Sequence, residues 1–219
     1  ITAANSNNIT GSVTLNATKD NASISFSGTA STFNAVVANA DDGISIGVDL
    51  STDVGGLTLE GDADNAADTN DNITFSAGTS LASFGNIALD ATTGKMTGAG
   101  GLTLNARTGI AVNDNLTTLG ATVINADSNN NGASNFSVAA GAAISTSGNT
   151  LSVTAPDIVL TGTLNSGAAL TTLIASNGGT IGLGATAGTF TLSGAELQNI
   201  TSTGLTIGDT TNGDVTVDG

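Results

Sequence analysis

The chain has 219 residues, of which 10% are charged and 3% are aromatic, and its formal net charge is −15. Its three basic residues, Lys19, Lys95 and Arg107, are too few for a surface that binds phosphate, which excludes nucleic acid and anionic lipid surfaces as partners. No run of about 18 apolar residues exists, so we expect no membrane insertion. Without His and Cys there is no Ser–His triad, thiol chemistry or Cys/His zinc site, and we expect no enzyme.

The remaining composition favours a thin core that is repeated many times. Hydrophobic residues make up 39% of the chain and Gly contributes 30 residues, while Trp and Tyr are absent. Such a core must be built from Val, Ile, Leu and Ala. This suits a structure of small cross-section.

A short word of the form apolar-x-apolar-x-small recurs from end to end of the chain. In chain order it reads VTLNAT (13–18), ISFSGT (24–29), LTLEGD (57–62), ITFSAG (73–78), IALDAT (87–92), LTLNAR (102–107), FSVAAG (136–141), LSVTAP (151–156), IGLGAT (181–186), FTLSGA (190–195) and VTVDG (215–219). Alternation with a period of two predicts half-buried β-strands. The nearest helical candidate, Ala195 to Asn199, is about one turn long.

Two longer alignments indicate the size of the repeat. Residues 102–127 match residues 151–176, and each stretch contains three short apolar segments before the next copy of the first begins about 20 residues later. Residues 59–78 also match residues 124–141, with a polar middle that differs by two residues, which we interpret as one corner of variable length.

These patterns predict an all-β fold, a right-handed parallel β-helix (β-solenoid) with about 20 residues and three short strands per rung. Residues 1–219 would form one β-solenoid segment of roughly 11 rungs and about 50 Å, part of a longer repetitive chain. Neither end shows a capping repeat, and Ile1 falls inside the pattern, so we expect the native start to lie upstream. Phe26, Phe75, Phe136 and Phe190 occupy apolar positions of the strand words and are expected in the core.

Several segments give the chain a resemblance in repeat style to filamentous-haemagglutinin-like giant exoproteins, the two-partner-secretion adhesins of Gram-negative bacteria. The segments are GGLTLNARTGIAV (100–112), INADSNNNGASNFSVAAGAAI (124–144), GTIGLGATAGTFTLSGAELQNITSTGLTIGD (179–209) and NGDVTVDG (212–219). The resemblance implies a right-handed β-helix, an extracellular or cell-surface location and an adhesive or scaffolding role. Its partners would be further rungs of the same chain, other copies of itself, and host-cell or abiotic surfaces.

The densest acidic stretch, DADNAADTND, is the one candidate for a cofactor, since no other is expected. Asp62, Asp64, Asp68 and Asp71 could offer oxygen ligands to calcium, although the EF-hand glycine and glutamate are missing. The other reading is a solvated corner loop.

Two functions from different classes remain open. The first is a stiff stalk segment of a bacterial surface adhesin. The second is a self-assembling subunit of an extracellular filament, sheath or surface layer, joined end to end by β-strand addition. Chain length separates them, because a stalk continues for many more rungs.

Overall fold

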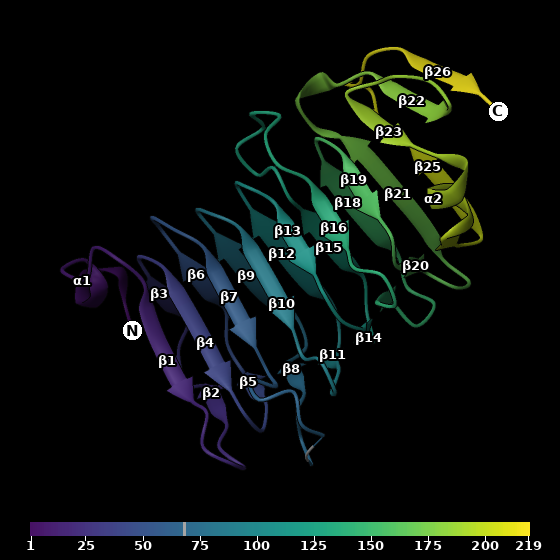
Figure 1. Cartoon of the computed structure of the whole chain (residues 1–219). Coiled ribbons are helices and arrows are strands. Elements are labelled where there is room, and N and C mark those ends of the chain that lie inside the picture. Colours follow the sequence, from purple (N-terminus) through teal and green to yellow (C-terminus); the bar gives the residue numbers. More distant parts are fainter. Residues whose placement is uncertain (68) are drawn as a thin grey trace.

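The computed structural model describes residues 1–67 and 69–219, with residues 3 and 4 as backbone only. The chain winds as a right-handed coil of three parallel sheets, and Figure 1 shows their strands stacked side by side along the coil axis. The expected fold class is therefore confirmed. Each turn of the coil, called a rung here, contributes one strand to each sheet.

The strands of the three sheets follow one another in strict rotation. Sheet A contains β1 (Val13–Ala17), β4 (Val36–Ala40), β7 (Leu57–Glu60), β10 (Ile87–Asp90), β13 (Ile110–Val112), β16 (Phe136–Val138) and β19 (Ile158–Leu160). Sheet B contains β2 (Ile24–Phe26), β5 (Ile44–Ile46), β8 (Ile73–Phe75), β11 (Met96–Gly98), β14 (Leu116–Thr118), β17 (Ala143–Ser145), β20 (Thr163–Asn165) and β24 (Ile200–Thr201). Sheet C contains β3 (Ser31–Phe33), β6 (Leu50–Thr52), β9 (Thr79–Ser83), β12 (Leu102–Ala106), β15 (Thr122–Asn125), β18 (Leu151–Ala155), β21 (Leu170–Ala175) and β25 (Gly204–Ile207).

The described part of the coil holds fewer rungs than expected, because its corners are longer than the strand words suggest and because three of the words form a separate sheet. Sheet A has 7 strands, so seven complete rungs are present, about 30 Å of rod at roughly 4.8 Å per rung. From the start of one sheet A strand to the next, a rung takes between 21 and 30 residues.

The core is a set of apolar columns that run along the axis. In sheet B, Ile44, Ile73, Met96 and Leu116 stand in register on successive strands and are fully or almost fully buried. The alternate residues face outward, as the period of two predicts. Phe26, Phe75, Phe136 and Phe190 are buried as expected, and Phe33 joins them by packing edge-on against Phe26.

The first of the two alignments matches the structure and the second does not. Leu102 and Leu151 both begin strands of sheet C, and the segments after them lie in sheets A and B in both copies. In the second alignment, residues 61–72 join sheet A to sheet B, whereas residues 126–135 join sheet C to sheet A. The two polar stretches are therefore different corners, and their similarity is one of composition.

The N-terminal end of the coil is covered on one of its three sheets. Residues 1–9, which include α1 (Ala3–Ser6), lie along β3, where Thr32 N–H donates to the Ile1 carbonyl at 3.1 Å. Asn34 Nδ2 donates to the Ile9 carbonyl at 2.7 Å. The expectation of an uncapped end is thus wrong for sheet C, while β1 and β2 are the terminal strands of sheets A and B.

Near the C-terminus the chain leaves the coil and then returns to it. After β21 come a short 3₁₀ turn η1 (Ser176–Gly178), then β22 (Ile181–Gly184) and β23 (Phe190–Leu192), which pair with β26 (Val215–Asp218) in a small sheet D. The words at residues 181, 190 and 215 therefore form sheet D and are not further rungs. Helix α2 (Gly194–Gln198) follows β23 and begins with a capping box between Ser193 and Glu196, after which β24 and β25 resume sheets B and C.

This excursion leaves β19 as the last strand of sheet A, and side chains bond to its backbone instead of another strand. Leu160 N–H donates to Glu196 Oε1 at 3.2 Å, and Asn199 Nδ2 donates to the Leu160 carbonyl at 3.1 Å. Just before β19, Asp157 Oδ1 accepts from Thr191 N–H at 2.7 Å. The edge of sheet A is therefore occupied by polar side chains.

Candidate functional site

An outward column of small polar side chains follows sheet B along the rod. One outward residue of each strand pairs in register with an outward residue of the next strand. The column consists of Ser25, Ser45, Thr74, Thr97, Thr117, Ser145, Asn165 and Thr201. These side chains follow one another at a spacing of about 4.8 Å, and they can exchange hydrogen bonds with a hydroxylated ligand. They include no general base and no group that activates a nucleophile.

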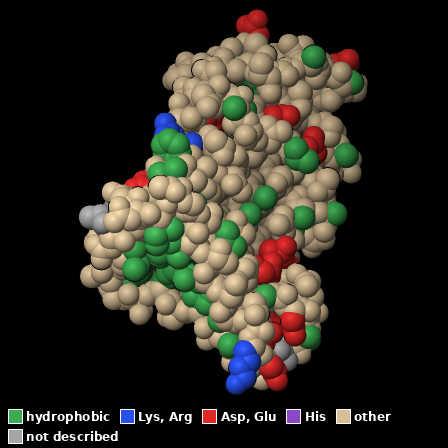
Figure 2. Space-filling view, turned by 60° about the vertical axis from the view of Figure 1, so that its left-hand side comes forward, with side chains coloured by type: hydrophobic (Ala, Val, Ile, Leu, Met, Phe, Trp, Pro, Cys, Tyr) green, Lys and Arg blue, Asp and Glu red, His purple; other side chains and the backbone are tan. Residues whose placement is uncertain are grey.

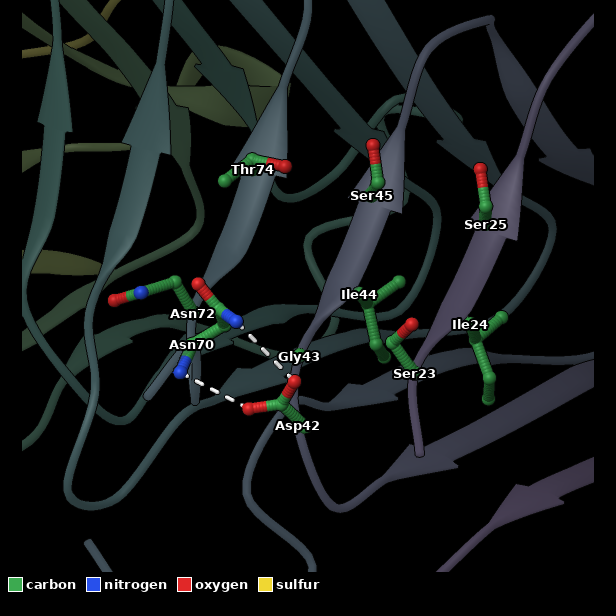
Figure 3. A pocket seen from close by; sticks show the side chains of 10 residues that line it. All are labelled: Ser23, Ile24, Ser25, Asp42, Gly43, Ile44, Ser45, Asn70, Asn72 and Thr74. Carbon is green, nitrogen blue, oxygen red and sulfur yellow. Dashed lines mark hydrogen bonds between the residues drawn. The ribbon is translucent and has the colours of Figure 1, made fainter. Parts of the chain in front are cut away.

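The first three members of this column line a shallow depression of about 270 Å³ (Figure 3). Its rim is formed by Asp42 and Asn70, which come from corners of successive rungs. Asn70 N–H donates to Asp42 Oδ1 at 3.0 Å, and Asn70 Nδ2 donates to Asp42 Oδ2 at 3.2 Å. The one carboxylate at this depression is thus already held by an amide.

Acidic residues gather where sheet A passes into sheet B. We call this edge the acidic corner, and its described members are Asp20, Asp41, Asp42, Glu60, Asp62, Asp64, Asp71, Asp90 and Asp114. They belong to the first five rungs, and Figure 2 shows acidic side chains gathered at the lower right of the molecule. The sequence placed a calcium candidate in this corner.

The four predicted ligands of that candidate do not share one environment in the structure. Asp62 and Asp71 are buried and both bond to Thr93 of the next rung: Thr93 N–H donates to Asp62 Oδ2 at 2.7 Å, and Thr93 Oγ1 donates to Asp71 Oδ2 at 3.0 Å. Asp64 is exposed and accepts from Ala66 N–H at 2.8 Å within a local turn. Asp68 lies outside the described residues.

Three further carboxyls of the corner influence one another. Glu60 and Asp90 are register partners on β7 and β10, and Asp114 follows β13 on the next rung. Burial raises the pKa of Glu60, and the charges of Asp90, Asp62 and Asp114 raise it further. Burial also raises the pKa of Asp114, and Asp90 and Asp62 add to the effect. Glu60 and Asp114 are therefore harder to ionise than isolated carboxyls.

Asp127 is a buried carboxylate whose two oxygens both accept hydrogen bonds. It is 2% exposed, and its two oxygens accept from the backbone N–H groups of Asn131 and Gly132 at 3.0 and 2.9 Å. Ser176 Oγ donates to Asp127 Oδ2 at 2.6 Å. This residue has a structural role, and sequence reasoning passed over it because it is a lone acid in a polar stretch.

Arg107 and Phe84 form a second feature that sequence reasoning missed. Phe84 is 45% exposed, unlike the Phe residues of the core, and the Arg107 guanidinium carbon lies 4.1 Å from the centre of its ring. Thr52, Asp53 and Asn105 surround the pair at a shallow depression of about 320 Å³. The guanidinium covers a face of the ring, so the pair stabilises the corner by a cation–π contact.

Comparison with known proteins adds no identification. No family model, no curated protein and no solved structure matches the chain. No helix among the described residues is long and apolar enough to cross a membrane. Within residues 1–67 and 69–219, no three acidic side chains converge closely enough to hold a metal ion by themselves. The fold defines the chain as a repeat protein of the parallel β-solenoid class.

Proposed function

We propose that the chain is a stiff stalk segment of a secreted bacterial surface adhesin. The observation that carries the proposal is the unbroken stacking of seven rungs in three parallel sheets, with apolar columns running the length of the coil. The repeat style that resembles haemagglutinin-like exoproteins supports the location, on the surface of a Gram-negative bacterium. The segment would serve to hold other parts of the polypeptide away from the cell.

The physical basis is the direction of the hydrogen bonds. In a solenoid, the backbone ladders lie along the axis, so bending or stretching the rod must break many bonds at once. Small hydroxyl and amide side chains cover the outer face of sheet B and keep it solvated without charge. Since each rung contacts its neighbours, rungs can be added without a change of design, which suits a spacer.

The test is the mass of the intact polypeptide, measured on denatured material from the source cells and detected with an antibody against this segment. The stalk proposal expects several hundred kilodaltons and labelling of intact cells by the same antibody. A polypeptide close to the 21.0 kDa of this chain would overturn the proposal in favour of a filament, sheath or surface-layer subunit. A large polypeptide that the antibody reaches only after lysis would overturn the surface location.

A further inference from the structure

Asp62 carries a buried carboxylate oxygen that the structure leaves without a hydrogen-bond partner. The residue is 0% exposed. Its Oδ2 accepts from Thr93 N–H, which fixes the side chain toward the next rung, while Oδ1 accepts from no donor. Removing a carboxylate oxygen from water without a hydrogen bond or an opposite charge is costly.

Asp114, two rungs further along, is partly buried and also has one bonded and one unbonded carboxylate oxygen. Its Oδ1 accepts from Asn115 N–H at 2.6 Å, and its Oδ2 is buried without a partner. With the rungs numbered from β1–β3, the residues on both sides of it bond to rung 4, which is formed by β10, β11 and β12: Asn113 N–H donates to the Leu89 carbonyl, and Met96 N–H donates to the Asn115 carbonyl. Asp114 is therefore held directly beside the rung 4 corner, the same corner that Asp62 reaches through Thr93.

The surroundings of these two carboxylates are rich in acids and small residues, and Lys95, the basic residue of the same rung 4 corner, is exposed. The charges of Asp90 and Asp62 act on Asp114, and all three act on Glu60. At the rung 3 and rung 4 positions equivalent to Asp114 stand Gly61 and Ala91, so Asp114 is the only acid of these three positions. Like charges at this density favour an ion that supplies positive charge.

We propose that Asp62 Oδ1 and Asp114 Oδ2 bind one divalent cation, calcium by its chemistry, which clamps rungs 3, 4 and 5 together at the acidic corner. Only oxygen ligands are present, which suits calcium and disfavours zinc and copper. Calcium accepts six to eight oxygens in a flexible arrangement, so water and backbone carbonyls complete a shell that the acids begin. The inference is independent of the stalk proposal.

This site differs from the loop that the sequence suggested. The loop site would need Asp64, which is exposed and engaged in a local turn, whereas the proposed site joins Asp62 of rung 3 to Asp114 of rung 5. Asp62 belongs to both. Asp64 and Asp114 therefore distinguish the two sites, and each can be changed to Asn with the same loss of charge and almost no change of shape.

The experiment uses the 219-residue chain, stripped of metal and titrated with calcium chloride by calorimetry. We expect one calcium ion per chain with a dissociation constant on the order of 10⁻⁴ to 10⁻³ M, and a rise in the unfolding midpoint of about 3–10 °C at 10 mM calcium. Magnesium at equal ionic strength should give a much smaller rise. Asp114→Asn should weaken calcium binding at least tenfold, and Asp64→Asn should leave it unchanged.

Three results would overturn the proposal: no saturable binding to the unaltered chain, equal stabilisation by magnesium and calcium, or loss of binding in Asp64→Asn with retention in Asp114→Asn. Asp114 is only partly buried and Asn keeps an acceptor for Asn115 N–H, so we expect this variant to fold. Asp62→Asn is the second variant. It should also weaken calcium binding at least tenfold, and its far-ultraviolet circular dichroism should match that of the unaltered chain.

Discussion

Ser176 Oγ lies 2.6 Å from Asp127 Oδ2, although 49 residues separate the two in the chain. Asp127 follows β15 and Ser176 follows β21, and β18 lies between these strands in sheet C. The bond therefore links residues that belong to two rungs with one rung between them.

Replacing Asp127 by Ala should destabilise the coil by about 2–4 kcal/mol, because it leaves Ser176 and two backbone N–H groups without their acceptor. Ser176→Ala should cost about 1–3 kcal/mol, since a buried carboxylate then loses one donor. Urea unfolding followed by circular dichroism measures both. Ala at the exposed Asp53 is the control, and an equal loss there would contradict the assigned role.

Phe136 fills the sheet A column between Ile110 and Ile158 and is fully buried. Phe136→Ala should reduce the free energy of unfolding by about 3–5 kcal/mol, because it removes a large side chain from a packed core. Val159→Ala, on the neighbouring strand but facing outward, should change it by less than about 1 kcal/mol. Similar losses for both variants would mean that burial in this column does not contribute to the free energy of unfolding.

A corner position can require glycine because its φ is positive or because a Cβ would collide with a neighbour, and Gly43 and Gly141 allow these two reasons to be tested separately. Both have positive φ, +89° and +87°, where a side chain is strained by about 1–2 kcal/mol. A Cβ at Gly141 would meet open space, whereas one at Gly43 would lie 2.5 Å from the Asn70 carbonyl oxygen and 2.6 Å from that of Asn72. Thermal unfolding should therefore show Gly43→Ala to be clearly more destabilised than Gly141→Ala. The reverse order would contradict the described corner geometry.

The contributions of Asp41 and Asp209 to the free energy of unfolding should change in opposite directions with pH. Burial raises the pKa of Asp41 above its ordinary 3.8, with the charges of Asp64, Asp20 and Asp42 adding to it, despite a hydrogen bond from Asn21 N–H. Its ionised form therefore destabilises the fold at neutral pH, and this penalty disappears as the pH falls below the unfolded-state pKa. Hydrogen bonds from Thr211 lower the pKa of Asp209, so its stabilising effect is present above its unfolded-state pKa and is lost as the pH falls through its folded-state pKa.

The paired variants Asp41→Asn and Asp209→Asn test these signs. At pH 7 the first should raise the unfolding midpoint and the second should lower it, and both differences should shrink toward pH 3. Thermal melts at a series of pH values measure this. A difference that stays constant with pH would show that the effect of the substitution is steric and independent of ionisation.

The sequence predicts the coil because each strand word carries its own signal. Alternation at Leu102 to Ala106 or Leu151 to Ala155 shows which residues face inward, without reference to any other part of the chain. The corners carry no such signal: residues 61–72 and 126–135 share Asp and Asn, yet they join different pairs of sheets. Composition shows that a turn occurs there, and only the register of the strands shows which corner it is.

The candidate site could be predicted only in part for a similar reason. The acidic loop was visible, and Asp62 was among its residues. Its relationship to Thr93 and Asp114 depends on how many residues each of the intervening corners takes up, which no local pattern records. The departure into sheet D was missed because the words at residues 181 and 190 are indistinguishable in pattern from rung strands.

The polar side chains at β19 have a consequence for aggregation. Parallel, in-register strands are also the architecture of amyloid, which grows when an open strand edge templates the next chain. At this edge Leu160 N–H and carbonyl groups are already occupied by Glu196 and Asn199, and Asp157 presents a carboxylate beside them. An incoming strand would have to displace these bonds and place its backbone against negative charge, so sheet A ends in a surface that resists recruitment of foreign strands.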